Sequence, residues 1–349
     1  MLDYYLSEGL LKDREVKLPV PYFTDQKNEY DLLMHGVAIR DTGDNTFLKL
    51  TGKDVQDFLH RISTNDLREF EINSVKNTVF CTEKGRIIDR VQVCKTEGSF
   101  WLMGNKNRDD VLKRWIQKYI ITDDVAIDGK DQLSAFEILG AQNEAFINFK
   151  FGDTAGALPA NNCTEIEWEN HFYLLVKLSD PAKGTYFRII ATPGALKHFI
   201  TDTLQNSFIF QIGLAGELAY ERYRIEKGIL SVNELNDAFN PHEAGIIEDV
   251  SGTKGCYIGQ EVIARLDTYD KVQRQIRKIS VEGNLDISSG VQIVDESGND
   301  AGTITSGYFV ESDNKTIALA YIRKQFLDGH TKLVTASEQE PKNIRFRNY

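Results

Sequence analysis

Glycines recur through the C-terminal part of the chain and separate short runs of alternating polar and apolar residues. They stand at positions 283, 290, 298, 302, 307 and 329. The clearest strand-like runs between them cover residues 317–322 and 332–335. Short strands at regular spacing, interrupted by turn residues, are typical of a small barrel. We therefore predict a β-barrel over residues 276–349.

The preceding residues mix hairpin strands with amphipathic helices. Residues 78–81 and 87–93 flank a turn at Gly85, which is a strand–turn–strand pattern. Apolar residues within 55–62 follow the i, i+3, i+4, i+7 spacing of a helix. Thr192 and Pro193 have the residue types of a helix N-cap and first helical position. Hairpins with interspersed helices predict an α+β fold instead of a doubly wound parallel sheet.

A chain of 349 residues is too long for one ordinary core. We predict an α+β core of two packed subdomains over residues 1–245, a linker with a short helix over 246–275, and then the barrel. Within the core, two early prolines predict that residues 1–30 form an extended entry segment.

Composition and charge exclude several classes of protein. The chain is 41% hydrophobic and 27% charged, which is typical of globular proteins, and it has no apolar run of about 20 residues that could span a membrane. A net charge of −11 argues against general binding to nucleic acid or to anionic membranes. The N-terminus has neither the pattern of a secretory signal nor that of an Arg-rich transit peptide, so we expect a cytoplasmic location.

Four cysteines are spread widely along the chain, at positions 81, 94, 163 and 256. They form no CxxC pair and no zinc-binding spacing, so neither a disulfide framework nor a metal site is indicated. A reducing compartment fits this usage best.

The stretch Lys254-Gly255-Cys256-Tyr257-Ile258-Gly259-Gln260-Glu261 combines two glycines, one cysteine and a lysine. Residues 260–265 are good helix formers and predict a short helix after Gly259. Cys256 would then lie just before a helix N-terminus and two residues from Lys254, and positive potential from either source favours a thiolate. The alternative is that Cys256 is a small buried hydrophobic residue, as most free cysteines are.

This stretch resembles the K-[GA]-C-Y-x-G-Q-E signature of the YgfZ-type folate-binding proteins, which are relatives of the glycine-cleavage aminomethyltransferase, or T-protein. Further segments resemble that family along most of the chain. They are Thr64-Asn65-Asp66, Lys84 to Asp89, Arg224 to Gly228, Pro241 to Gly245, Gly302 to Ser306 and Ile317 to Ala320. The resemblance implies a GcvT-like folate-binding core of mixed sheets and helices, followed by the small C-terminal β-barrel.

Two departures separate the chain from T-proteins. Their R-T-G-Y-T-G-E-D-G segment, whose glutamate grips the pterin, corresponds here to residues 177–184, which contain no such glutamate. The paired aspartates of their G-G-I-x-D-D segment become Asp89-Arg90. T-proteins also lack the cysteine signature. These differences favour the YgfZ branch, which the resemblance links to iron–sulfur cluster assembly or repair with tetrahydrofolate.

The resemblance assigns roles to individual residues. Cys256 is the reactive group, and Lys254 would favour its thiolate. Asp89 is the carboxylate expected to face the reactive folate nitrogens, although a solvent-facing aspartate on a hairpin strand is an equal alternative. Tyr257 would shield the thiol or stack on the pterin, or pack in a core. The other residues assigned to folate binding are Asn65, Asp66, Arg90, Arg224, Glu226 and Gln260.

Several of these residues have an ordinary structural alternative. Asn65 and Asp66 suit a turn at a helix end. Arg90 suits the cover of a strand face, which is the safer expectation. An intramolecular ion pair between Arg224 and Glu226 is as good an explanation as a contact with folate.

Three functions follow from this sequence. We favour an accessory protein that binds tetrahydrofolate, or a one-carbon derivative of it, and uses Cys256 in maturing or repairing iron–sulfur enzymes, including those that modify tRNA. Its expected partners are folate and iron–sulfur proteins or their assembly factors, with no direct contact to nucleic acid or membrane. The alternatives are a folate-dependent aminomethyl or methyl transferase, and a folate-sensing scaffold without chemistry.

Overall fold

The computed structural model describes residues 1–11, 19–129, 133–206, 209–268, 272–287, 290–336 and 341–347. They form two compact units. Unit one comprises Met1–Val55, Glu69–Lys76 and Gln92–Tyr223, and unit two comprises Gln56–Arg68, Asn77–Val91 and Arg224–Tyr349. The boundaries proposed from sequence at residues 245 and 275 stay a prediction, since the compact units divide the chain at other positions.

A six-stranded sheet forms the centre of unit one, in the order β11-β1-β7-β10-β9-β8. Neighbouring strands are antiparallel except β1 and β11, which are parallel. The strands are β1 (Val37–Asp41), β7 (Ser134–Leu139), β8 (Asn162–Trp168), β9 (His171–Asp180), β10 (Gly184–Ala191) and β11 (Ile212–Leu214).

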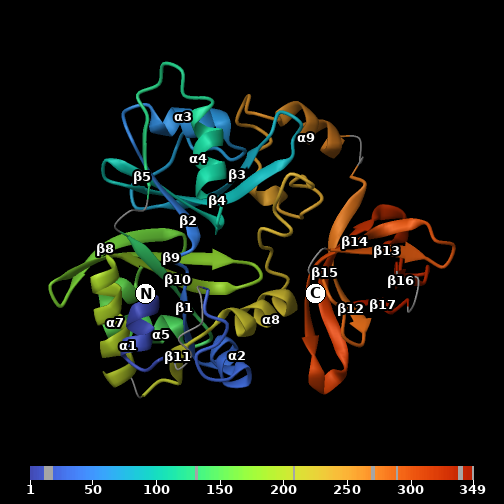
Figure 1. The fold of residues 1–349 in the computed structure, drawn as a ribbon. Helices are drawn as coiled ribbons and strands as arrows, with labels where there is room; N and C mark the ends of the chain where they lie inside the picture. Colours follow the sequence, from blue (N-terminus) through green and yellow to red (C-terminus); the bar gives the residue numbers. More distant parts are fainter. Residues whose placement is uncertain are drawn as a thin grey trace. The chain divides into compact units, whose positions relative to one another are not determined.

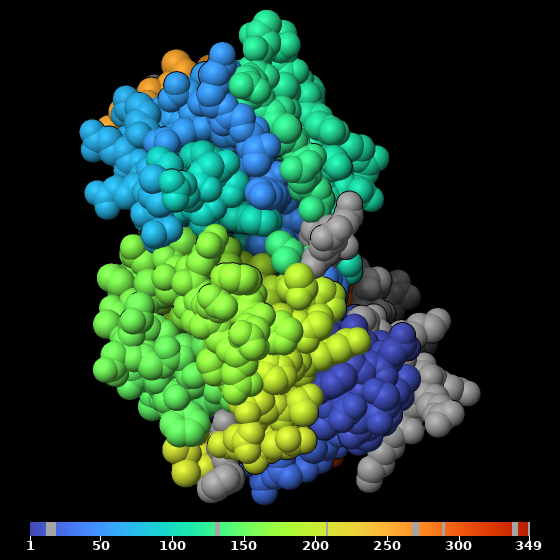
Figure 2. Space-filling model, turned by 90° about the vertical axis from the view of Figure 1, so that its left-hand side faces the viewer, coloured from blue at the N-terminus to red at the C-terminus, as the bar shows by residue number. Residues whose placement is uncertain are grey.

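Helices α1 (Leu2–Ser7), α2 (Gln26–His35), α5 (Asn143–Phe151), α6 (Asp153–Gly156) and α7 (Pro193–Asn206) belong to the same unit. The predicted start of α7 is confirmed, because Pro193 is its first residue and the Thr192 hydroxyl accepts from Ala195 N at 3.4 Å. Apolar side chains of α7, including Phe199, join those of the sheet in one buried cluster. Figure 2 shows the dark-blue N-terminal residues beside the yellow-green α7, where Tyr4 donates to the carbonyl of Lys197.

The extended segment predicted over residues 1–30 is wrong for its two ends, which form α1 and the start of α2. Proline blocks helix only around its own position, so helices can form on either side of it. Asp25 caps α2, since its side chain accepts from Asn28 N at 3.0 Å. Residues 12–18 of the predicted segment lie outside the described residues.

A five-stranded sheet has the order β3-β4-β5-β2-β6. Its turn at Gly85 has φ +67°, a left-handed conformation that glycine adopts without strain. The predicted hairpin about this turn and the helix predicted over residues 55–62 are confirmed. The elements are β2 (Asn45–Thr51), α3 (Val55–Ile62), β3 (Val75–Cys81), β4 (Ile87–Thr96), β5 (Ser99–Lys106), α4 (Asp109–Gln117) and β6 (Ala126–Asp128).

A closed barrel ends unit two, with the strand order β12-β15-β14-β13-β16-β17, drawn in orange and red in Figure 1. Its strands are β12 (Arg274–Glu282), β13 (Val291–Asp295), β14 (Asp300–Val310), β15 (Lys315–Arg323), β16 (Leu333–Thr335) and β17 (Asn343–Phe346). Inward-facing aliphatic residues fill it, among them Ile279, Ile304 and Ala320. The predicted barrel and the α+β class are confirmed.

Helices α8 (Glu217–Lys227) and α9 (Gln260–Thr268) lie on either side of a long irregular stretch that contains the short 3-10 helix η1 (Ile247–Asp249). The short 3-10 helices η2 (Glu311–Asp313) and η3 (Lys324–Phe326) lie in the barrel connections. Within the described residues, no helix is both long and apolar enough to cross a membrane.

Candidate functional site

All residues that the sequence assigns to the site belong to unit two. The residues before Cys256 are hydrogen-bonded to the segment that follows α3. Thr64 N donates to Val79 O at 3.0 Å, and Ser251 N donates to Thr64 O at 3.0 Å. The buried Thr64 hydroxyl donates to Asp249 O at 2.7 Å and accepts from Val79 N at 2.9 Å. Thr64 therefore links residues 249–251 to Val79, which lies toward the end of β3.

Lys254 anchors the next part of the same stretch. Its buried ammonium donates to the carbonyls of Ser63 at 2.6 Å and Asn65 at 2.8 Å, and also to that of His60 in the last turn of α3. The C-terminal carbonyls of a helix have no partners within the helix and attract a cation. Burial lowers the pKa of Lys254 to about 8. The lysine thus holds the end of α3 and the turn after it, and its predicted effect on the Cys256 thiolate stays a prediction.

Cys256 follows directly from this anchor and is exposed. The alternative that it is a buried hydrophobic residue is therefore wrong. Gly255 and Gly259 on either side have φ +92° and +83°. A Cβ on Gly259 would lie 2.5 Å from the carbonyl oxygen of Thr82, so only glycine fits this close approach. The predicted helix after it is confirmed as α9, which begins at Gln260.

Tyr257 points away from solvent. It packs in a buried cluster with Val79, Cys81 and Ile87, and burial raises its pKa to about 12. The Lys254 ammonium lies 5.2 Å from the centre of its ring. Tyr257 therefore fixes the chain on the C-terminal side of Cys256, and Lys254 fixes it on the N-terminal side. The exposed thiol thus lies between two buried side chains.

Asn65 and Asp66 form the turn that follows α3. The Asn65 side chain donates to Asn77 O at 2.8 Å and accepts from Asp66 N at 2.8 Å. Asp66 forms an ion pair with Arg68 at 2.6 Å, and this hydrogen-bonded guanidinium lowers the pKa of the carboxyl well below its usual range. The helix-end turn expected as their structural alternative is present.

Asp89 and Arg90 are neighbours on β4, where Asp89 is buried and Arg90 is partly exposed. Asp89 is buried, so the solvent-facing alternative is wrong. Arg90 Nε donates to Asp249 Oδ2 at 2.6 Å, and its guanidinium lies 3.9 Å from Glu248. Because Asp249 also bonds Thr64, Arg90 belongs to the network that holds the stretch before Cys256.

Arg224 belongs to a different cluster. Its side chain is only 2% exposed, pairs with Glu234 at 3.4 Å and donates to Ser306 Oγ of the barrel at 2.8 Å. Burial and an internal carboxylate partner disfavour the predicted contact with folate. The expected partner Glu226 lies partly exposed in the last turn of α8, and Gln260 lies partly exposed at the first position of α9.

Known proteins resemble this chain in sequence and in fold. A family model described as the GCVT N-terminal domain matches residues 9–254. The chain belongs to this family. A chloroplastic protein of Arabidopsis thaliana, whose name calls it a putative transferase, is 26% identical over 310 residues, 88% of this chain and 70% of the relative. An aminomethyltransferase of Staphylococcus carnosus is 24% identical over 333 residues, 92% of this chain and 88% of the relative.

The fold of this GCVT-family chain matches a solved structure over its whole length. The glycine cleavage system aminomethyltransferase T from Bartonella henselae superposes with a TM-score of 0.83, covering 100% of this chain and 96% of that one. The two sequences are only 17% identical, so the match shows the fold alone. It confirms the GcvT-like architecture with its terminal barrel.

Sequence reasoning missed a group of buried charges in unit one. Arg40, Glu137 and Arg188 are cross-strand neighbours on β1, β7 and β10. Glu137 accepts from Arg188 at 2.8 Å and lies 3.3 Å from both Arg40 and Lys183. A signal was present, because Glu137 and Arg188 each interrupt an apolar run on their strand, and Arg40 directly follows the apolar run 37–39 on β1.

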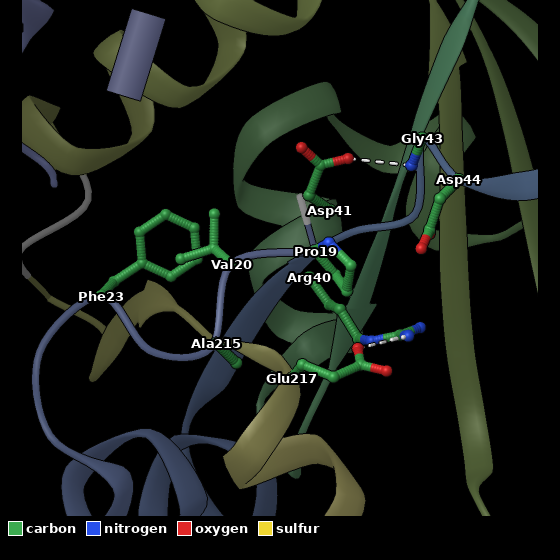
Figure 3. A pocket seen from close by; sticks show the side chains of 9 residues that line it. All are labelled: Pro19, Val20, Phe23, Arg40, Asp41, Gly43, Asp44, Ala215 and Glu217. Carbon is green, nitrogen blue, oxygen red and sulfur yellow. Dashed lines mark hydrogen bonds and ion pairs between the residues drawn. The ribbon is translucent and has the colours of Figure 1, made fainter. Parts of the chain in front are cut away.

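A small pocket opens beside this group. Figure 3 shows Arg40 beside Glu217 on one side of it and Asp41 bonded to the amide of Gly43 on another. Arg40 Nε is buried and makes no hydrogen bond to the part of the chain that the structure describes, and Asp44 Oδ2 lies 3.3 Å from Lys106 Nζ. The pocket suits ordered water or a small polar group. It is lined by Pro19, Val20, Phe23, Arg40, Asp41, Gly43, Asp44, Ala215 and Glu217.

In the described ranges, no group of three or more His, Cys, Asp or Glu side chains is arranged to hold a metal ion.

The anchor formed by Lys254 leads to a prediction. Replacing Lys254 with Met should lower the free energy of unfolding by about 2–4 kcal/mol, because three carbonyl oxygens lose a charged donor. Urea denaturation would measure the change. The exposed Lys84, replaced in the same way, is the control and should change stability by less than about 0.5 kcal/mol. Equal effects of the two substitutions would argue against the anchor.

Proposed function

We propose that this chain is a YgfZ-type protein that binds tetrahydrofolate, or a one-carbon derivative of it, and serves as an accessory factor in iron–sulfur cluster assembly or repair. The clients would include enzymes that modify tRNA, and Cys256 would be the reactive group. The observation that carries the proposal is the contrast among the cysteines. Cys256 is exposed between two anchored neighbours, whereas Cys81, Cys94 and Cys163 are buried.

The residues of unit two fit a folate in part. Asp89 is a carboxylate withdrawn from solvent, which suits a partner for the N–H groups of a pterin ring. Gln260 is partly exposed four positions after Cys256 and could bond a polar edge. Arg90 and Arg224, which the resemblance also assigns to folate binding, are less suitable, because both already pair with carboxylates of this chain. Asp89 is the residue of this group whose substitution tests the folate assignment.

An exposed thiol can do three kinds of chemistry. As a thiolate, Cys256 can attack an electrophilic one-carbon unit, exchange with a disulfide, or hold iron or sulfide for a short time. A single cysteine cannot retain a complete iron–sulfur cluster, since such clusters are usually held by four thiolates. Any cluster would therefore be met on a partner protein.

Aminomethyl transfer is the second candidate. One observation favours it: relatives of 22–24% identity are named aminomethyltransferases. The segment 177–184 lacks the glutamate that the resemblance assigns to pterin binding in T-proteins. Turnover of an aminomethyl donor with tetrahydrofolate would support aminomethyl transfer and contradict the accessory role.

Two measurements test the proposal. Calorimetry should detect binding of tetrahydrofolate to the wild-type protein, and Asp89→Asn should weaken it about tenfold or more. Asp57→Asn, on the exposed face of α3, is the matched control. Deleting the gene should lower the activity of iron–sulfur enzymes, and Cys256→Ser should fail to restore it. Unchanged enzyme activities, or full rescue by Cys256→Ser, would sink the accessory role.

The exposure of Cys256 can be checked directly. In the native protein we expect iodoacetamide to modify Cys256 about 100-fold faster than the other three cysteines, because reaction of a buried thiol requires local unfolding. Peptide mapping after timed labelling gives the four rates. Slow labelling of Cys256, at the rate of Cys81, would mean that the thiol is not available for chemistry.

A further inference from the structure

Two buried cysteines of unit one lie side by side, although 69 positions separate them in the chain. Cys94 is on β4 and Cys163 is on β8, and their side chains are 0% and 1% exposed. The Cys94 thiol donates to the sulfur of Cys163, with 3.0 Å between the two sulfur atoms. A disulfide has a sulfur–sulfur distance of about 2.05 Å, so the two sulfur atoms lie about 1 Å from bonding distance.

The backbone keeps the two cysteines together. The segment 73–75 lies between their strands and bonds to both. On one side Asn73 N donates to Lys95 O at 2.7 Å, and Lys95 N donates to Ser74 O at 3.1 Å. On the other side Cys163 N donates to Asn73 O and Val75 N donates to Asn161 O, each at 2.8 Å. Because the same three residues fix both strands, the sulfur pair does not depend on a flexible loop.

We propose that Cys94 and Cys163 are a redox-sensitive pair that forms a disulfide when the protein meets a small peroxide. The bond would tie β4 to β8 within unit one and enclose the long intervening chain. This site is separate from Cys256 and does not depend on the function proposed for it.

The chemistry balances with hydrogen peroxide as the oxidant. Both thiols are buried, so the peroxide reaches them when the fold opens locally. The Cys163 thiolate then attacks one peroxide oxygen, the O–O bond breaks, and hydroxide leaves and takes up the thiol proton as water, which gives a sulfenic acid on Cys163. The sulfur of Cys94 then attacks the Cys163 sulfur and displaces the hydroxyl group. Two thiols and one peroxide become one disulfide and two waters. The hydrogen bond from Cys94 lowers the pKa of Cys163, which favours Cys163 as the first nucleophile.

The test uses the wild-type full chain. The exposed Cys256 is first blocked with iodoacetamide in the native protein, which is then treated with hydrogen peroxide, unfolded and labelled with N-ethylmaleimide. We expect the label on Cys81 only, together with a joined Cys94–Cys163 peptide that has lost two hydrogen atoms. Dithiothreitol should restore both thiols. Labelling of both Cys94 and Cys163, or their separate conversion to sulfinic acid, would overturn the proposal.

Variants and melting temperature complete the test. Cys81→Ser is the matched control, since it removes another buried thiol and should leave the joined peptide in place. Cys94→Ser should abolish the joined peptide. Oxidation should raise the melting temperature of the wild type by about 4 °C or more, and should not raise that of Cys94→Ser. Equal melting temperatures of the oxidised and reduced wild type would contradict a bond that ties β4 to β8.

Discussion

Replacing Glu137 with Gln is expected to lower the free energy of unfolding by about 3–5 kcal/mol, because three buried cations lose their shared counter-charge. Glu137 is only 1% exposed and lies within 3.3 Å of Arg40, Lys183 and Arg188. The amide keeps the shape of the carboxyl group but has no charge. Urea denaturation at neutral pH, followed by circular dichroism, measures the loss.

The effect should depend on pH in a defined direction. Burial alone would raise the pKa of Glu137, but the attraction of Lys183, Arg188 and Arg40 outweighs it and holds the pKa well below the ordinary 4.5. A carboxyl whose pKa is lower in the folded state contributes its full stabilisation above the unfolded pKa. The gap between wild type and Glu137→Gln should therefore be constant above about pH 5 and shrink as the pH falls below 4.5.

Glu144 provides the matched control for Glu137. It also pairs with one cation of unit one, Lys177 at 2.8 Å, but its side chain is 54% exposed. Exposed ion pairs contribute little because water screens them, so Glu144→Gln should cost less than about 1 kcal/mol. A similarly small loss for Glu137→Gln would show that the three cations do not depend on the charge of Glu137.

The second large effect is expected at Arg224. Replacing it with Met should lower the free energy of unfolding by about 3–5 kcal/mol, because Glu234 is left buried without its cation. Glu234 also accepts from Ser231 N at 2.9 Å, Thr305 Oγ1 at 2.5 Å and Ser306 Oγ at 2.6 Å. The pair therefore joins the residues after α8 to the barrel within unit two.

A double-mutant cycle isolates the pair. Arg224→Met combined with Glu234→Gln should be less destabilised than the sum of the two single changes, by about 1–3 kcal/mol, since the double variant leaves no unpaired charge. The same proteins also test the folate contact once predicted for Arg224. A variant that unfolds normally but binds tetrahydrofolate far more weakly would restore Arg224 as a ligand residue. Strictly additive changes in the free energy of unfolding would contradict the ion pair.

The parts of the site that sequence reasoning predicted are local ones. Gly255 and Gly259 indicated a tight turn, and the helix formers after them indicated a short helix, and both are present. The exposure of Cys256 was not decided by its neighbours in sequence, because a free cysteine in such a turn can face either way. Lys254 shows the same limit. Its position two residues from the thiol suggested an electrostatic role, whereas its ammonium is bound by carbonyls about 190 positions earlier in the chain.

Local sequence patterns were enough to predict the hairpin at Gly85, the start of α7 at Pro193 and the presence of a C-terminal barrel. These follow from steric and hydrogen-bonding preferences that act over a few residues. The pairing of charged groups and of sulfur atoms could be read only from the folded chain, as for Glu137 with Arg188, Arg224 with Glu234, and Cys94 with Cys163. Such partners depend on how strands and loops distant in the chain pack together, and the energy of each pair exists only once that packing has removed water from around it.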